Sequence, residues 1–172
     1  MGESILFLCS GNAARSVIAG VALRQRRPDL HVETAGTLTV DGMPISWRTR
    51  AALDDVGLPW PRHASRQAHR AHLAAADLVV GLAPEHVEWV RREHPELAAR
   101  SGTLIRLTQH LAPPPRPPQL RGLADRVAAV KLEQAQLQQW EEVVDPGGGE
   151  VEQFVACARQ IVVLVDHLAT LL

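Results

Sequence analysis

Eight consecutive residues near the start of the chain combine the side chains that phosphate chemistry needs. In order they are Cys9, Ser10, Gly11, Asn12, Ala13, Ala14, Arg15 and Ser16. A cysteine can act as a nucleophile, and a guanidinium presents a fork of N–H donors to two oxygens of a tetrahedral oxyanion. Gly11 and Asn12 tolerate the backbone angles that turn amide groups toward an anion. The segment therefore predicts a phosphate-binding loop with a thiol at its start.

The place of this loop in the chain strengthens the prediction. It follows the apolar run 4–8, which is typical of a buried strand, and it opens a stretch with helical spacing. Anions bind where a helix begins after a parallel strand, because the first amides of the helix are free there. Those amides and Arg15 favour the thiolate of Cys9, and the Ser16 hydroxyl could donate a hydrogen bond to it. Such a thiolate can attack phosphorus without a metal or another cofactor.

The elements that position the loop follow from the hydrophobic pattern. Strands and helices alternate through the first half of the chain, which predicts a parallel sheet. The predicted strands cover 4–9, 30–34, 76–82 and 103–107. The predicted helices cover 13–25, 46–56, 84–92, 123–140 and 150–172. The proline-rich stretch 113–118 predicts a stiff, extended connection inside a single domain, 1–172, although such stretches can also dock a partner.

Composition limits the partners that the protein can have. The chain has 18 basic and 19 acidic residues and a net charge of −1, which argues against nucleic acid or a membrane surface as a partner. Its two cysteines are too few for a disulfide framework, and the apolar run near the start is too short for a membrane span. We expect a cytoplasmic protein that is a monomer or a weak homodimer.

The loop and three later segments, 33–37, 63–67 and 144–146, resemble the low-molecular-weight protein tyrosine phosphatases and the related arsenate reductases. The resemblance covers most of the chain. It implies an α/β three-layer sandwich, in which a four-stranded parallel sheet has helices on both faces and the phosphate-binding loop follows the first strand. It also implies that Cys9 is the nucleophile, that Arg15 binds phosphate, and that Asp145 is the general acid and then the base. His63 could orient the loop.

The chain departs from this family in the walls of the substrate slot. Many members have tyrosines after the Asp-Pro pair and a tryptophan after the Ala-Gly-Thr stretch, where this chain has Gly147, Gly148 and about Val40. Trp47 or Trp140 could provide an aromatic wall instead, or could lie in the core. Stacking walls supply much of the affinity for a phosphotyrosine ring. We therefore expect a wide slot that discriminates little between phosphotyrosine and small aryl phosphates.

Two further positions differ from the family pattern. Ala14 replaces a second loop cysteine that some members have, which excludes a disulfide inside the loop, and Ala83 replaces a frequent aspartate. Cys157 is predicted to be a core thiol on the last helix, distant from the loop. His69 and His72 could share a helical face, but no third metal ligand has a matching spacing, and we predict that they are surface residues.

Three functions fit these residues. The first is a phosphatase acting on phosphotyrosine in proteins or on another aryl phosphate, the second an arsenate reductase that uses a small external thiol, and the third a phosphate-sensing binding module. Asp145 favours the first, because a departing alkoxide or phenoxide needs a proton donor.

Overall fold

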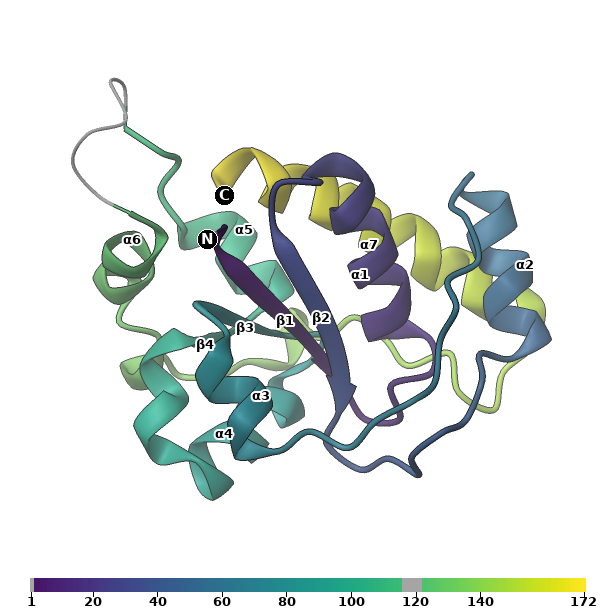
Figure 1. Ribbon diagram of the computed structural model, residues 1–172, viewed down its shortest axis with the longest axis horizontal. Helices are drawn as coiled ribbons and strands as arrows, with labels where there is room; N and C mark the ends of the chain where they lie inside the picture. The colour runs from purple at the N-terminus through teal and green to yellow at the C-terminus, as the bar shows by residue number, and fades with distance from the viewer. Residues whose placement is uncertain (1, 116–121) are drawn as a thin grey trace.

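A four-stranded parallel sheet forms the middle layer of the structure (Figure 1). The computed structural model describes residues 2–115 and 122–172, so Pro117 and Pro118 of the proline-rich stretch lie outside the described residues. The strands are β1 (Ser4–Cys9), β2 (His31–Gly36), β3 (Leu78–Gly81) and β4 (Ser101–Thr103), in the order β2-β1-β3-β4. Because all pairs are parallel, the carboxyl ends of β1, β2 and β3 meet at one edge of the sheet.

Helices cover both faces of this sheet, as predicted (Figure 1). One face carries α1 (Arg15–Arg26), α5 (Leu104–His110) and α7 (Val151–Leu171), with α2 (Trp47–Asp55) packed against α7 and α6 (Leu123–Val130) at the side. The other face carries α3 (Arg70–Ala75) and α4 (Pro84–Glu93). The predicted three-layer architecture is therefore confirmed.

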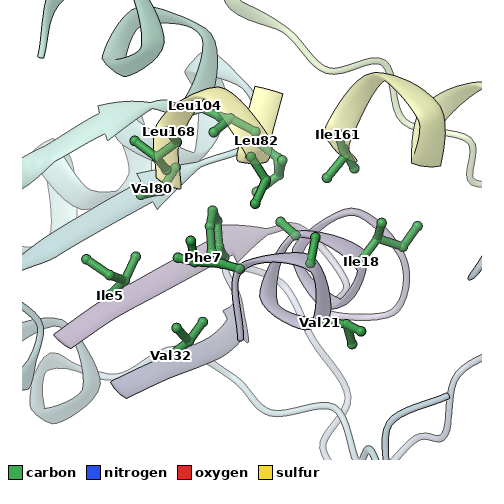
Figure 2. Close-up of a cluster of buried hydrophobic side chains, with 14 of the residues drawn as sticks. Ile5, Phe7, Ile18, Val21, Val32, Val80, Leu82, Leu104, Ile161 and Leu168 are labelled. Atoms are coloured by element: carbon green, nitrogen blue, oxygen red, sulfur yellow. The ribbon is translucent and has the colours of Figure 1, made fainter. Parts of the chain in front are cut away.

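Alternating side chains of β1 pack against the helices on the two opposite faces of the sheet. Ile5 and Phe7 belong to the larger apolar cluster with α1, α5 and α7, whereas Leu6 and Leu8 belong to the smaller one with α3 and α4. All four are at most 1% exposed. Figure 2 shows Phe7 among residues of the larger cluster, which include Ile18, Val80, Leu82, Leu104 and Ile161. A strand that is buried on both faces has a continuous apolar sequence, and β1 has such a sequence.

The long helix α7 anchors the larger cluster. By length and composition it could span a membrane, with a mean hydropathy of 1.6 over its most apolar window. In this fold, however, Ile161, Val165 and Leu168 are completely buried, and the helix packs against α1, α2 and α5. One face of the helix therefore contributes its apolar side chains to the core.

The predictions for the middle of the chain were partly wrong. The predicted strand 103–107 is mostly helix, because only Ser101–Thr103 pairs with β3 and the Thr103 hydroxyl then caps α5 by accepting the Arg106 N–H at 3.2 Å. The predicted helix 123–140 stops early, because Lys131 adopts a left-handed conformation with φ of 54°. Short 3₁₀ turns at Leu132–Gln134 and Gln139–Glu141 follow it. The sequence also did not predict α3 or the 3₁₀ turn Pro95–Arg100.

The outer edge of β2 is covered by side chains and by a neighbouring segment. Arg24 donates two hydrogen bonds to the Val32 carbonyl, at 2.7 and 3.1 Å, and the Nε of Arg66 donates one to the Thr34 carbonyl at 2.8 Å. Gly36 completes the row, since its N–H donates to the Arg66 carbonyl and its own carbonyl accepts the Ala68 N–H. The carbonyl oxygens of Val32, Thr34 and Gly36 at this edge thus have partners within the chain.

Candidate active site

The loop between β1 and α1 is held in shape by the buried side chain of Asn12. This residue has a left-handed backbone with φ of 49°. Its amide nitrogen donates to the hydroxyls of Ser16 and Thr34, both at 3.0 Å, and its amide oxygen accepts the Arg66 N–H, also at 3.0 Å. The Nε2 of His63 lies 2.7 Å from the Asn12 carbonyl, and burial holds the pKa of this ring below its usual value, which favours the neutral form.

The segment that follows β2 supports the same loop from the other side. The Ser10 carbonyl accepts hydrogen bonds from the Leu38 N–H at 3.0 Å and from the Thr39 hydroxyl at 2.9 Å. A Cβ atom on Gly36 would collide with both the Thr39 hydroxyl and the Ser10 carbonyl oxygen. A glycine is therefore required at Gly36, because two backbone segments approach each other closely there.

Cys9 lies at the start of the loop, where its thiol is almost fully buried. The Sγ atom is 3.0 Å from the Ser16 hydroxyl oxygen. Since that oxygen already accepts a hydrogen bond from Asn12, the Ser16 hydroxyl proton can point at the sulfur. A donor aimed at sulfur stabilises a thiolate relative to a thiol.

The buried guanidinium of Arg15 connects the loop to a distant part of the chain. One terminal nitrogen donates to the Val143 carbonyl at 3.1 Å, and the other lies 2.7 Å from Oδ2 of Asp145. Val143 is itself tied to the end of β3, because its N–H donates to the Leu82 carbonyl at 2.8 Å. This contact positions Asp145 beside the loop, and the Gly147 N–H donates to the other carboxylate oxygen at 2.9 Å.

Cys9, Arg15 and Asp145 line one cavity of about 300 Å³. The predicted catalytic residues are thus brought together, although 130 positions separate Arg15 from Asp145. The other lining residues come from the loop, the start of α2, the glycine turn and α7; they are Gly11, Ala13, Ala14, Ser46, Thr49, Gly147 and Phe154. Such a mixture of a thiol, a cation and a carboxylate suits the binding of a phosphate group and the transfer of a proton to or from it.

The aromatic side chain in this cavity is not one that the sequence suggested. Among the described residues that line it, only Phe154 has an aromatic ring. Trp47 is 58% exposed and Trp140 is 51% exposed, so neither is a core residue and neither lines the cavity. Val40 is 74% exposed and also lies outside the lining.

Cys157 is a buried core thiol, as predicted, but its helix is not distant from the loop. Phe154, one turn earlier in α7, lines the cavity, and Cys157 shares the larger apolar cluster with Cys9. Burial raises the pKa of Cys157 to about 12, so it is a thiol at neutral pH.

His69 and His72 are placed at the start of α3. Across residues 2–115 and 122–172, no three His, Cys, Asp or Glu side chains are grouped as metal ligands.

Sequence reasoning missed several residues of the site. Four residues reach the site through tertiary packing, and nothing in their local sequence identifies them as site residues. They are Ser46, Thr49, Val143 and Phe154. His86 was also missed, although one signal was present. It is the third residue of the helix that follows β3, and the carboxyl end of β3 lies beside the loop.

Comparison with known proteins gives a consistent result. The family model described as "Low molecular weight phosphotyrosine protein phosphatase" matches residues 4–112. A protein-arginine-phosphatase of Geobacillus stearothermophilus is 24% identical over 170 residues, which cover 98% of this chain and 95% of that protein. A low molecular weight protein-tyrosine-phosphatase of Streptomyces coelicolor is 32% identical over 120 residues, covering 66% and 71%.

Solved structures share the fold at low sequence identity. The YwlE arginine phosphatase from Geobacillus stearothermophilus superposes with a TM-score of 0.75 at 24% identity, covering 97% of this chain and 90% of that one. Vibrio vulnificus Wzb in complex with benzylphosphonate superposes with a TM-score of 0.77 at 18% identity, covering 100% of both chains.

Proposed function

The chain belongs to the low molecular weight phosphotyrosine protein phosphatase family, and on that premise we propose that it hydrolyses phosphate esters on proteins, phosphotyrosine being the first candidate substrate. One observation carries this proposal: the Cys9 thiol, the Arg15 guanidinium and the Asp145 carboxyl group line a single cavity. They correspond to the nucleophile, the oxyanion clamp and the proton donor of the reaction.

In the first half of the proposed reaction, the loop residues 10–16, with the guanidinium of Arg15 among them, hold the phosphate above the sulfur of Cys9. The thiolate attacks phosphorus, a sulfur–phosphorus bond forms, and the bond from phosphorus to the leaving oxygen breaks. Asp145, in its protonated form, gives its proton to the departing phenoxide. A positioned proton donor of this kind contributes about 10²–10⁴ in rate.

In the second half, Asp145 acts as a base. It takes a proton from water, the water oxygen attacks the phosphorus of the phosphocysteine, and the sulfur–phosphorus bond breaks. Inorganic phosphate leaves, and the thiolate is restored with Asp145 protonated for the next cycle. The hydrogen bond from Ser16 stabilises the sulfur anion both as attacking and as leaving group.

A second candidate substrate is phosphoarginine in proteins. A relative that aligns with almost the whole chain is named a protein-arginine-phosphatase. The site also has features that suit a cationic leaving group, since Asp145 is half exposed at the cavity and glycine replaces the ring that would stack on phosphotyrosine. A carboxylate can form paired hydrogen bonds with a guanidinium.

The reactive sulfur also bears on where the protein works. Cys9 and Cys157 are both free thiols in the structure. Because the proposed nucleophile must stay reduced, we place the activity in a reducing compartment such as the cytoplasm. The substrate class is then a phosphorylated protein of that compartment.

The decisive experiment compares phosphate release from two peptides of identical sequence, one with phosphotyrosine and one with phosphoarginine. The wild-type protein, without added metal, is expected to release phosphate from at least one of them, and Cys9→Ser from neither. A ratio of kcat/KM that favours one peptide identifies the substrate class. No release from either peptide or from para-nitrophenyl phosphate would reject the phosphatase proposal, and arsenate reduction with a small thiol would then be measured.

A further inference from the structure

Ser10, the residue directly after the proposed nucleophile, has three polar neighbours, and the proposed reaction does not use two of them, His86 and Glu85. Its hydroxyl oxygen lies 3.1 Å from Nε2 of His86, 3.3 Å from Oε1 of Glu85 and 3.4 Å from a terminal nitrogen of Arg15. His86 and Glu85 are in the first turn of α4, the helix that follows β3 in the chain. The contact therefore joins α4 to the phosphate-binding loop.

The direction of each hydrogen bond in this group follows from the burial of His86. The ring is completely buried, and its Nδ1 accepts the Ala83 N–H at 3.0 Å, so its proton is on Nε2. Burial and the positive charge of Arg15 lower the pKa of His86 to about 3, which keeps the ring neutral across the range of any ordinary assay. Nε2 therefore donates to the Ser10 hydroxyl oxygen at 3.1 Å, which is nearer than Oε1 of Glu85 at 3.4 Å.

These contacts then set the hydrogen-bond roles of the Ser10 hydroxyl and the direction of its O–H bond. Its oxygen accepts from both His86 and Arg15, which uses its two lone pairs. Its own proton can only point to Glu85, the third neighbour. A hydroxyl that is fixed in this way presents a stationary acceptor to Arg15 rather than a rotating one.

This acceptor matters because of how Arg15 is held. The guanidinium has three protein acceptors, which are the Val143 carbonyl, the Asp145 carboxylate and the Ser10 hydroxyl. A bound phosphate would take the place of the Asp145 carboxylate, because both are anions that compete for the same nitrogen. Val143 and Ser10 then remain to fix the plane of the guanidinium against the phosphate.

We propose that His86 is a positioning residue that orients the Arg15 phosphate clamp through the Ser10 hydroxyl. This inference rests on the proposed function of the loop. The competing explanation is that His86 only caps α4, where it occupies the third helical position. His72 does the same on α3, because its Nδ1 accepts the His69 N–H at 3.2 Å. The chain thus contains a matched capping histidine away from Ser10.

The test separates capping from positioning. His86→Asn keeps an acceptor near the position of Nδ1 but has no donor that reaches Ser10, whereas His86→Gln restores a donor near the position of Nε2. The dissociation constant for inorganic phosphate, measured by calorimetry, is expected to rise about fivefold in His86→Asn, to recover in His86→Gln, and to stay unchanged in the control His72→Asn.

A double-mutant comparison tests the route through Ser10. In a Ser10→Ala background, His86→Asn is expected to cause no additional loss of phosphate affinity or of kcat/KM. An equal loss with and without Ser10, or an unchanged phosphate affinity in His86→Asn, would overturn the proposal. If His86→Asn does not fold, Ser10→Ala alone decides, because an unchanged phosphate affinity in that variant also rejects the proposal.

The phosphate titration needs no turnover. Failure of the wild-type protein to hydrolyse any phosphate compound would therefore reject the proposed function, while the role of His86 would still be judged by phosphate affinity. Conversely, an active enzyme whose phosphate affinity does not respond to His86 keeps the function and loses this inference.

Discussion

Arg15 and Asp145 form an ion pair in the cavity, with a terminal guanidinium nitrogen 2.7 Å from Oδ2. The guanidinium is 2% exposed, whereas the carboxylate is 51% exposed. The buried guanidinium of Arg15 is therefore paired with the half-exposed carboxylate of Asp145. In the proposed reaction, an incoming phosphate displaces this carboxylate, which frees Asp145 to face the leaving group.

The ion pair predicts opposite effects of Asp145→Asn on binding and on turnover. Without the competing charge, inorganic phosphate should bind several-fold more tightly, because an ion pair whose carboxylate is half exposed contributes only on the order of 1 kcal/mol. The kcat should fall by about 10²–10⁴, and more for phenyl phosphate than for para-nitrophenyl phosphate, whose leaving group needs less protonation. Phosphate inhibition constants and kcat for both esters measure this. Weaker phosphate binding in the variant would contradict the displacement of the carboxylate.

The two cysteines predict contrasting outcomes. Cys9→Ser should reduce hydrolysis of para-nitrophenyl phosphate on the order of 10⁴-fold or more, because a hydroxyl is a far weaker nucleophile. It should still bind phosphate, since Arg15 and the loop amides remain. Cys157→Ala is the control and should retain activity, because its buried thiol takes no part in the reaction. Loss of activity in Cys157→Ala with an unchanged melting temperature would show that the second thiol has a chemical role.

The aromatic ring in the cavity predicts a change in KM. Phe154→Ala should raise KM for phenyl phosphate about five- to tenfold, because an aromatic contact with the substrate ring is lost, and should change kcat little. Trp140→Ala serves as the control, because its ring lies over Arg106 outside the cavity. Steady-state kinetics of the two variants decide the matter. An unchanged KM in Phe154→Ala would place the substrate ring elsewhere.

The buried histidine predicts a particular dependence of stability on pH. The pKa of His86 is about 3 in the folded protein and 6.5 when unperturbed, so between these values the unfolded chain binds one more proton. This contribution to stability is complete above pH 6.5 and decreases by roughly 1.4 kcal/mol per pH unit as the pH falls toward 3.

Urea unfolding between pH 5 and 7 measures this slope. The slope should be smaller in His86→Gln than in the wild-type protein, and the exposed His167→Gln variant should behave like the wild type. The comparison is made between proteins because burial also lowers the pKa of His63 and His72, which contribute in the same direction. Identical slopes in wild type and His86→Gln would mean that His86 is not held neutral by burial.

The sequence predicted those residues of the site that lie close together in the chain. Cys9, Asn12, Arg15 and Ser16 are consecutive or nearly so, and their relation is set by one strand, one turn and the start of one helix. The apolar pattern therefore determines their arrangement directly. Asp145 was identified by resemblance, and its place beside Arg15 depends on the tertiary hydrogen bond of Val143 to the end of β3.

The errors came from segments in which local preference and tertiary context disagree. Thr103 and Ile105 suit a strand by propensity, but the pairing with β3 ends at Thr103, and its hydroxyl then begins a helix. The amphipathic pattern after Leu123 continues beyond Lys131, yet the left-handed backbone of Lys131 stops the helix. The positions of His86 and Phe154 required knowledge of which helices pack beside the loop.

The covered edge of β2 has a consequence for the behaviour of the protein in concentrated solution. A bare edge strand offers unpaired backbone groups that recruit strands from other molecules and so seed β-rich aggregates. Here Arg24 and Arg66 occupy the carbonyl oxygens of Val32 and Thr34. Replacing both arginines would leave these two carbonyl oxygens without their side-chain donors, so we expect the double variant to form β-rich aggregates more readily than the wild-type protein.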